Sequence, residues 1–233
     1  YYTSSSAQAQ LGNLGLMSAE DGFGFQRAAF LSDCQEQGLV ASVDATIHGM
    51  LPLQNAFGAG TRAKALSALL GVPVDTLNDY RVLLFSLNPL DAQRAAVSWP
   101  DTCRSMIARD ADRTRLIVSV AALVPHERLA ASGSQHQLTA QITARGHLLV
   151  NIHGKKTTQI SISPQDIFAW RSGHFCWSQN DPSQGPILRA DDPSFDACPE
   201  GYDNAPPPGS AWSNTPIEQV APGGPSPKAE EQT

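Results

Sequence analysis

The sequence predicts an α+β domain in which N-terminal helices pack on a C-terminal antiparallel meander sheet of about four strands. Two observations lead to this fold class. Helix start signals with apolar residues at helical spacing recur in the first half of the chain, and alternation of apolar and polar residues replaces them in the second half. A change from a run of helices to a run of strands is typical of α+β proteins.

The composition limits the function before any motif is considered. The chain has 233 residues and a net charge of −6, with only 16 Lys and Arg residues. This length is sufficient for one well-buried core with flanking tails. Affinity for nucleic acid comes from clustered cations, so a nucleic-acid partner is not expected. No apolar run approaches about 18 residues, the length that a membrane-spanning helix needs.

Residues 1–17 are rich in Ser, Gln and Gly and are predicted to form a flexible lead-in. The chain starts at Tyr1 without a methionine, and Ala7-Gln8-Ala9 has the form of a signal-peptidase site. These two features favour an exported protein whose signal or single membrane anchor lies upstream of Tyr1. The alternative is an arbitrary chain boundary.

Residues 18–113 are predicted to be mainly helical. Ser18 and Asp21 have the spacing of a capping box at the start of a helix that ends near Gln37. Pro89 gives a second start signal because proline suits the first helical position, and Asp101 is the expected N-cap of a last helix. These helices are the expected cover for the apolar face of the sheet.

A helix-turn-helix pattern covers residues 63–80, with Gly71 at the turn and a second helix expected from Pro73 toward Leu84. The second helix would present Asp75 and other acids to DNA, and carboxylates that face phosphates weaken binding. A cytosolic DNA-binding regulator is therefore the least favoured function. A helical hairpin packed on the sheet is the preferred interpretation.

Residues 114–163 are predicted to form the antiparallel sheet. The run 116–124 is rich in β-branched residues, and the runs 137–143, 147–153 and 157–163 alternate between apolar and polar side chains. Glycine-containing turn signals separate the alternating runs, as they do in hairpins. Three runs with one shared alternation indicate a meander with a buried face and a solvated face.

The chain has four cysteines. None of them belongs to a C-x-x-C pair, and the absence of such a pair excludes zinc-ribbon and thioredoxin motifs. Of the three possible pairings we predict Cys34–Cys103 and Cys176–Cys198. The second would close a loop of about 20 residues within the loop-rich segment 164–200. Disulfides favour an oxidising compartment. The alternative is a cytosolic protein with four buried thiols.

Residues 201–233 are rich in Pro and Gly and are predicted to form a disordered tail. Just before this tail, aromatic residues gather around the cysteine loop. They are candidates either for a contact patch toward a protein partner or for a small core under the loop. The residues are Trp170, Phe175, Trp177 and Phe195.

The same loop carries a group of acidic residues that could bind Ca²⁺ in an exported protein. Their spacing does not match an EF-hand, so solvated turn carboxylates are the preferred interpretation. The group consists of Asp181, Asp191, Asp192 and Asp196.

No convergent catalytic set is recognisable. The histidines His48, His136, His147 and His153 are candidates for a general base, and the strand register decides whether any of them meet. His147 and His153 lie six residues apart on one expected strand, about 20 Å, so they cannot share an ion. The sequence assigns neither a metal nor a cofactor.

Together these features predict a non-enzymatic exported protein, periplasmic or in the cell envelope. It is expected to act through contact with a protein partner, for example in a secretion, pilus or other envelope assembly. The first alternative is an exported hydrolase with a histidine-based site. The second is the cytosolic helix-turn-helix regulator.

Overall fold

The computed structural model of the chain describes a part of its 233 residues. The described residues are 2–3, 10–18, 24–27, 44–52, 64, 67–68, 71, 73–88, 90, 92–93, 99, 101–130, 137–142, 148–153, 158–191, 197–208 and 210.

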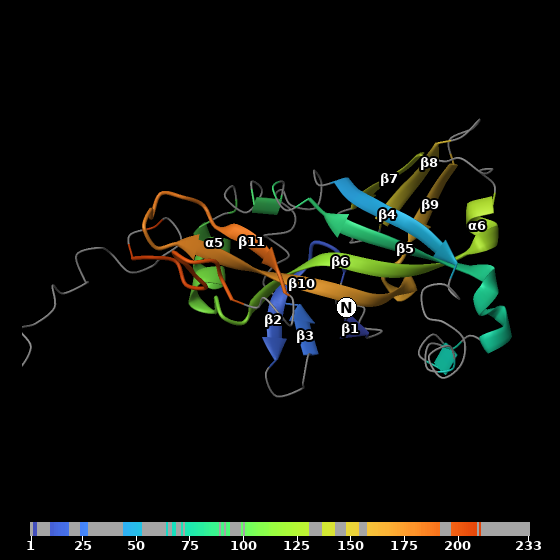
Figure 1. The fold of residues 1–233 in the computed structure, drawn as a ribbon, viewed down its shortest axis with the longest axis horizontal. Helices are drawn as coiled ribbons and strands as arrows, with labels where there is room; N and C mark the ends of the chain where they lie inside the picture. Colours follow the sequence, from blue (N-terminus) through green and yellow to red (C-terminus); the bar gives the residue numbers. More distant parts are fainter. Residues whose placement is uncertain are drawn as a thin grey trace, which may run out of the picture.

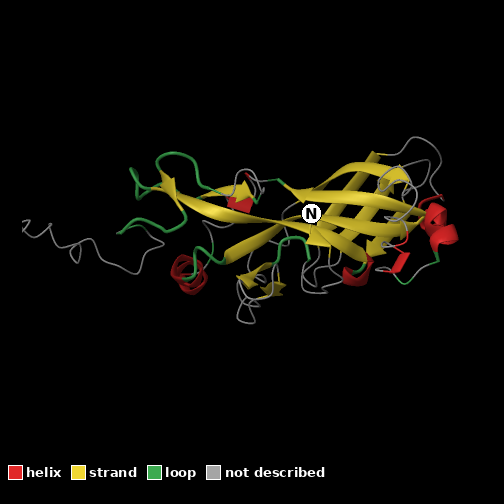
Figure 2. Cartoon of the chain, turned by 60° about the horizontal axis from the view of Figure 1, so that its bottom comes forward, coloured by secondary structure: helices red, strands yellow, loops and turns green. Residues whose placement is uncertain are grey.

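Antiparallel strands dominate both halves of the described structure, so the predicted layer of N-terminal helices is wrong (Figures 1 and 2). The strands are β1 (Tyr2–Thr3), β2 (Leu14–Ser18), β3 (Gly24–Arg27), β4 (Asp44–Pro52), β5 (Tyr80–Leu87), β6 (Thr114–Pro125), β7 (Gln137–Ile142), β8 (Leu148–His153), β9 (Thr158–Ile162), β10 (Ile167–Ser178), β11 (Ile187–Ala190) and β12 (Tyr202–Asp203). The helices with described bounds are α5 (Asp101–Arg109), α6 (His126–Ala130) and the 3₁₀ turns η3 (Val74–Asp79) and η4 (Pro164–Asp166). Residues 64, 67–68, 90 and 92–93 are also helical, where the sequence predicted a helix before Gly71 and another after Pro89.

The central sheet has the strand order β1-β10-β6-β5-β4-β7-β8-β9. Outside this path, β11 and β12 pair with β10, and β2 pairs with β3 and β6. Each of these pairings is antiparallel. The long strands β6 and β10 run side by side along the molecule and join the meander end to the end that carries β11 (Figure 1).

The sequence predictions of helix fail at two places within the described residues. Strand β3 lies inside the helix predicted over 18–37. The second helix of the helix-turn-helix pattern is replaced by the 3₁₀ turn η3 and strand β5. In β5, Leu83, Phe85 and Leu87 are buried at alternate positions, the period of a strand. Without a recognition helix the regulator interpretation loses its structural basis.

Other predictions are confirmed. Helix α5 forms where a last helix was predicted, with Asp101 as its first residue rather than its N-cap. The β-branched run became β6, and the three alternating runs became β7, β8 and β9. The predicted meander turns at residues 145–146 and 154–155 lie outside the described residues.

The sequence interpretation missed β10, the strand on which the candidate site is built. We expected a short turn over 166–170 and then a loop, whereas η4 leads directly into a strand of 12 residues. All its side chains are buried except Arg171, which is partly buried. A strand that is covered on both faces lacks the alternation by which strands are recognised.

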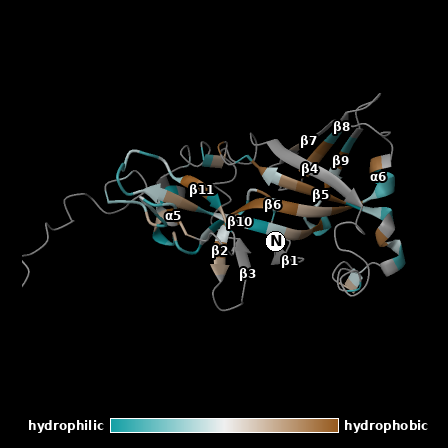
Figure 3. Cartoon of the chain, viewed as in Figure 1, coloured by the Kyte–Doolittle hydropathy of each residue, from teal (hydrophilic) through white to brown (hydrophobic). Residues whose placement is uncertain are grey.

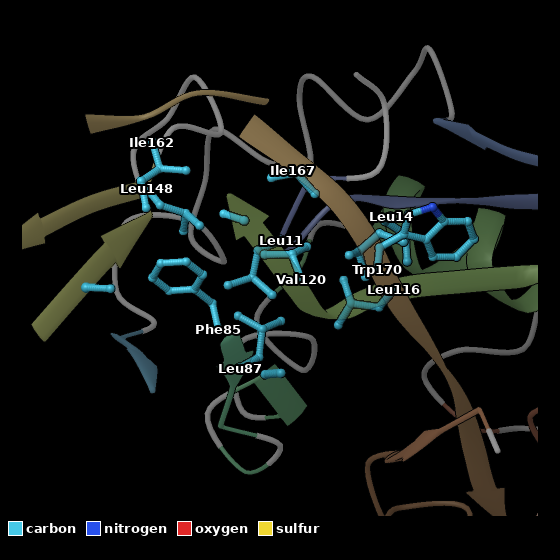
Figure 4. Close-up of a cluster of buried hydrophobic side chains, with 14 of the residues drawn as sticks. Leu11, Leu14, Phe85, Leu87, Leu116, Val120, Leu148, Ile162, Ile167 and Trp170 are labelled. Atoms are coloured by element: carbon cyan, nitrogen blue, oxygen red, sulfur yellow. The ribbon is translucent and has the colours of Figure 1, made fainter. Parts of the chain in front are cut away.

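The sheet curls so that distant strands share one core. Leu148 of β8 and Ile162 of β9 lie near Phe85 of β5, with Val120 of β6 and Ile167 of β10 beyond (Figure 4). In the sheet order, β4 and β7 separate β5 from β8. Side chains of β5 and β8 can therefore meet in one cluster only if the sheet bends around them.

A second, smaller cluster covers another face of the β5–β6–β10 region and brings in η3 through Leu77. Long stretches of β6 and part of β5 are coloured as hydrophobic, whereas much of the loop region beyond β11 is hydrophilic (Figure 3). None of the helices in the described part of the chain is long and apolar enough to cross a bilayer.

Candidate functional site

The predicted disulfide between Cys176 and Cys198 is confirmed. It links β10 to the segment before β12, across a sequence separation of 22 residues and a Cα–Cα distance of 5.7 Å. No cysteine among the described side chains is free. The predicted pair Cys34–Cys103 cannot be assessed, because Cys34 and the side chain of Cys103 lie outside the described residues.

Three neighbouring strands bring a polar cluster together beside this disulfide. We call Arg115, Ser172, His174 and Asp191 the Asp191 cluster. Arg115 lies on β6, Ser172 and His174 on β10, and Asp191 directly after β11. The Asp191 amide donates to the Ser172 carbonyl over 2.9 Å, so the pairing of β11 with β10 continues to Asp191.

The pairing of β6 with β10 is irregular at the same place. Its register shifts between Arg171 and Ser172, which pair with Ser119 and Ile117. Val118 is therefore the extra residue on β6, as in a β-bulge. Bulges redirect side chains and are common beside functional sites.

The carboxylate of Asp191 is the centre of the cluster. His174 Nδ1 donates to Asp191 Oδ1 over 2.7 Å, and Ser172 Oγ donates to Asp191 Oδ2. Arg115 Nε lies 3.2 Å from Oδ2, and Arg171 Nε donates to the Asp191 backbone carbonyl over 3.0 Å. Both carboxylate oxygens are thus satisfied by charge-assisted contacts.

Burial on its own raises the pKa of Asp191. The hydrogen bonds from His174 and Ser172 and the positive charge of Arg115 outweigh this effect, so the pKa lies below its ordinary value. Asp191 is therefore a stable anion at neutral pH. An ionised carboxylate can only accept, so His174 carries its proton on Nδ1 when it is neutral.

The second ring nitrogen of His174 is left with a lone pair and is buried. Among the residues that the structure describes, none makes a hydrogen bond with Nε2, and His174 is 1% exposed. The ligand-capable atoms of His174, Cys176 and Cys198 all lie within 4.8 Å of one another. Asp191 occupies Nδ1 of a histidine that lies beside the disulfide, so Nε2 is the ring nitrogen that remains able to bind a ligand.

This geometry does not form a serine-protease type of site. Ser172 donates to Asp191 and not to His174, so nothing in the described cluster activates the hydroxyl. His174 is also too deeply buried to meet a substrate. In the disulfide form the cluster joins three strands rather than forming an accessible catalytic centre.

Three of the four aromatic residues that were candidates for a contact patch are buried in the core. Trp170, Phe175 and Trp177 are each 1% exposed and belong to the main buried cluster. Phe175 packs edge-to-face on Trp99, with ring centroids 6.1 Å apart. The structure thus favours the core alternative over a contact patch for these three rings. Phe195 lies outside the described residues.

None of the four candidate histidines has a described side chain. His136 and His147 lie outside the described residues, and only the backbone places His48 on β4 and His153 on β8. His126 is exposed on α6.

The acidic group does not form a common site in the described part either. Asp181 is exposed and accepts hydrogen bonds from Ser183, whereas Asp191 pairs with His174 and Arg115. Asp192 and Asp196 lie outside the described residues.

Sequence reasoning did not find the pair His174–Asp191. The signal that could have found it is the spacing Ser172-x-His174-x-Cys176, which places three polar or sulfur side chains on one face of a strand. This spacing puts the three side chains on one face only in a strand, and the sequence patterns did not predict a strand over residues 167–178.

No protein-family model matches this chain, and no curated protein or solved structure is detectably similar to it. The arrangement of the site therefore has to carry the functional argument alone.

Proposed function

We propose that this chain is a non-enzymatic exported scaffold that presents a rigid polar loop to a protein partner. The observation that carries the proposal is an exposed loop between β10 and β11 that is fixed by hydrogen bonds, at the end of the molecule that carries the Cys176–Cys198 disulfide (Figure 1). We call residues 179–186 the hairpin loop. Loops held by a rigid sheet are common sites of recognition.

The hairpin loop is exposed from Gln179 to Gln184, yet hydrogen bonds fix its backbone. The Gln179 amide donates to the Gly201 carbonyl over 2.9 Å, and Gln179 Nε2 donates to the Ala205 carbonyl over 2.9 Å. Asp181 Oδ1 accepts from the Ser183 amide over 3.0 Å and from the Ser183 hydroxyl over 2.6 Å. A loop that is already ordered loses little conformational entropy when it binds.

The charge of this end suggests the chemistry of the partner. Asp181, Glu200 and Asp203 are exposed in or beside the hairpin loop, and the chain carries a net charge of −6. A partner surface rich in Lys and Arg would be attracted to it, and the attraction would weaken with salt. His174 is buried, so the Asp191 cluster itself does not offer the accessible base that a hydrolase needs.

The proposal is tested by placing a photo-crosslinking residue at Pro182, with Glu127 of α6 as the control. Both residues are exposed, and the elements that carry them, the loop between β10 and β11 and helix α6, lie at opposite ends of the molecule (Figure 1). In the native cells we expect a defined adduct from Pro182 that Glu127 does not give. Exchange of Glu200 and Asp203 for lysine should remove that adduct. Identical patterns from both positions would contradict a partner site on the hairpin loop.

The compartment is tested separately by acid quenching of intact cells and alkylation without reductant. We expect Cys176 and Cys198 to resist alkylation, because an exported chain carries them as a disulfide. If both residues are alkylated in the cell, the exported scaffold is excluded, whatever the crosslinking shows.

A further inference from the structure

We propose that reduction of the Cys176–Cys198 disulfide creates a Zn²⁺ site with His174 Nε2 and the two cysteine sulfurs as ligands. The juxtaposition that supports it is a group of three ligand atoms, all within 4.8 Å of one another, on β10 and the segment that the disulfide ties to it. His174 and Cys176 are two residues apart on one strand, so their side chains leave the same face.

An independent observation at His174 points to a ligand. Its Nε2 is buried and has no hydrogen-bond partner among the described residues. A buried polar atom without a partner is destabilising, and a metal ion would satisfy the lone pair. In the disulfide form the sulfurs are bonded to each other and cannot ligate as thiolates, so they cannot share a metal ion with Nε2.

Asp191 prepares His174 for this role. Metal-bound histidines usually donate their second N–H to a carboxylate, which fixes the tautomer and the orientation of the ring. Here Nδ1 donates to Asp191 Oδ1 over 2.7 Å, and Arg115 and Ser172 hold the carboxylate in turn. The carboxylate–histidine part of a zinc site is therefore already built when the sulfurs are oxidised.

The ligand distances suit Zn²⁺. With Zn–S bonds of about 2.3 Å and Zn–N bonds of about 2.0 Å, a tetrahedral ion keeps its ligand atoms roughly 3.3–3.8 Å apart. One imidazole nitrogen and the two sulfurs already lie within 4.8 Å of one another, and breaking the S–S bond frees the sulfurs to move apart to that separation. Two thiolates and one imidazole are ligands that zinc prefers. Cys198 is only partly buried, so the ion and a fourth ligand from solvent can approach from its side.

The reaction balances with a dithiol as the reductant. The dithiol gives two electrons and two protons, the Cys176–Cys198 bond breaks into two thiols, and the dithiol closes its own disulfide. Zn²⁺ then replaces the two thiol protons, which pass to solvent. Oxidation reverses the sequence and releases the ion. The site would therefore report the redox state of its surroundings.

The test uses the full chain after reduction by a water-soluble phosphine. The phosphine is oxidised to its oxide with the oxygen of one water molecule, so no added thiol competes with the protein for the metal. Zn²⁺ is titrated against a chromogenic indicator, and Co²⁺ serves as a spectroscopic probe of thiolate ligation. The matched control is the double variant Cys176→Ser/Cys198→Ser, which retains Cys34 and Cys103 and measures their background. We expect the reduced wild type to bind one Zn²⁺ more than this control.

Two further variants separate a built site from simple thiol binding. Their folding is verified first in the disulfide form by near-ultraviolet circular dichroism. After reduction, His174→Gln should weaken Zn²⁺ binding at least about tenfold, and Asp191→Asn should weaken it roughly 10- to 100-fold through the orientation of His174. The proposal is overturned if the wild type binds no more Zn²⁺ than the control. It is also overturned if His174→Gln leaves the affinity unchanged, or if the disulfide form binds equally well.

Discussion

At the scale of single residues, Asp191 is the group that ties β6 and β10 to the end of β11. Its carboxylate accepts hydrogen bonds from His174 and Ser172 of β10 and forms an ion pair with Arg115 of β6. Asp191→Asn removes the charge but keeps the shape, and leaves Arg115 partly buried without its counter-ion. We expect the free energy of unfolding to fall by about 2–4 kcal/mol at pH 7, measured with denaturant on the disulfide form. The exposed control Asp181→Asn should change it by less than about 0.5 kcal/mol.

The pH dependence of that difference has a defined sign. Because the folded-state pKa of Asp191 is lowered, folding is favoured by its ionised form. This contribution is fully present above the unfolded pKa of about 3.9 and is lost as the pH falls through the folded value. The wild type should therefore lose its advantage over Asp191→Asn progressively below about pH 4. A difference that stays constant from pH 7 to pH 3 would show that the charge of Asp191 does not stabilise the fold.

Gly173 is fixed by close packing between β6 and β11. A Cβ atom at this position would lie 2.6 Å from the Arg189 carbonyl oxygen and 3.0 Å from Val118 Cγ1. The backbone carbonyl cannot move without breaking the β10–β11 pairing, so Gly173→Ala should lower the free energy of unfolding by about 1–3 kcal/mol. The control is Ala190→Ser, an exposed change at the register partner of Gly173, which should be nearly neutral. Equal effects of the two substitutions would contradict the steric argument.

At the scale of elements, the ring pair Trp99–Phe175 joins the segment before α5 to β10. The edge-to-face geometry should contribute about 0.5–1.5 kcal/mol beyond the buried area. A double-mutant cycle of Trp99→Leu and Phe175→Leu measures this coupling in the free energy of unfolding. Hydrogen exchange in α5 should rise in both single variants. Strictly additive effects would show that the two rings do not interact specifically.

The elements differ in how far the sequence predicts them, and the reason is burial. The strands β7–β9 were predicted because alternation marks a strand with one solvated face. Strand β10 was missed because both faces are buried and its run of aromatic and apolar residues has no period. In β5, Tyr80 and Leu84 also have helical spacing, and the start signal at Pro73 led only into a 3₁₀ turn.

The candidate site was predictable only in its covalent part. The pairing Cys176–Cys198 follows from chain proximity and from the polar loop that it closes. The contact His174–Asp191 depends on the β10–β11 register, which pairs His174 with Arg189 and carries Asp191 to the position opposite Ser172. Register is a property of the sheet that surrounds a strand, so a local pattern does not reveal it.

At the scale of the whole molecule, stability should be divided between two ends. The curled sheet around Leu148, Ile162 and Phe85 has a large apolar core, whereas the end beyond β11 is hydrophilic and held by the disulfide (Figures 3 and 4). Cys176→Ala/Cys198→Ala should therefore lower the free energy of unfolding by about 3 kcal/mol, the loop-closure value for a loop of this length.

The loss should also be local before it is global. Hydrogen exchange should accelerate in β11, β12 and the hairpin loop, because local unfolding of these segments becomes more frequent without the disulfide. Exchange in β8 and β9 should change little. The exposed control Ser183→Ala should leave the meander amides unchanged and affect only its own turn with Asp181. Uniform acceleration over all strands would mean that the molecule opens as one cooperative unit. The disulfide would then stabilise the curled core as much as the loop that the proposed partner contacts.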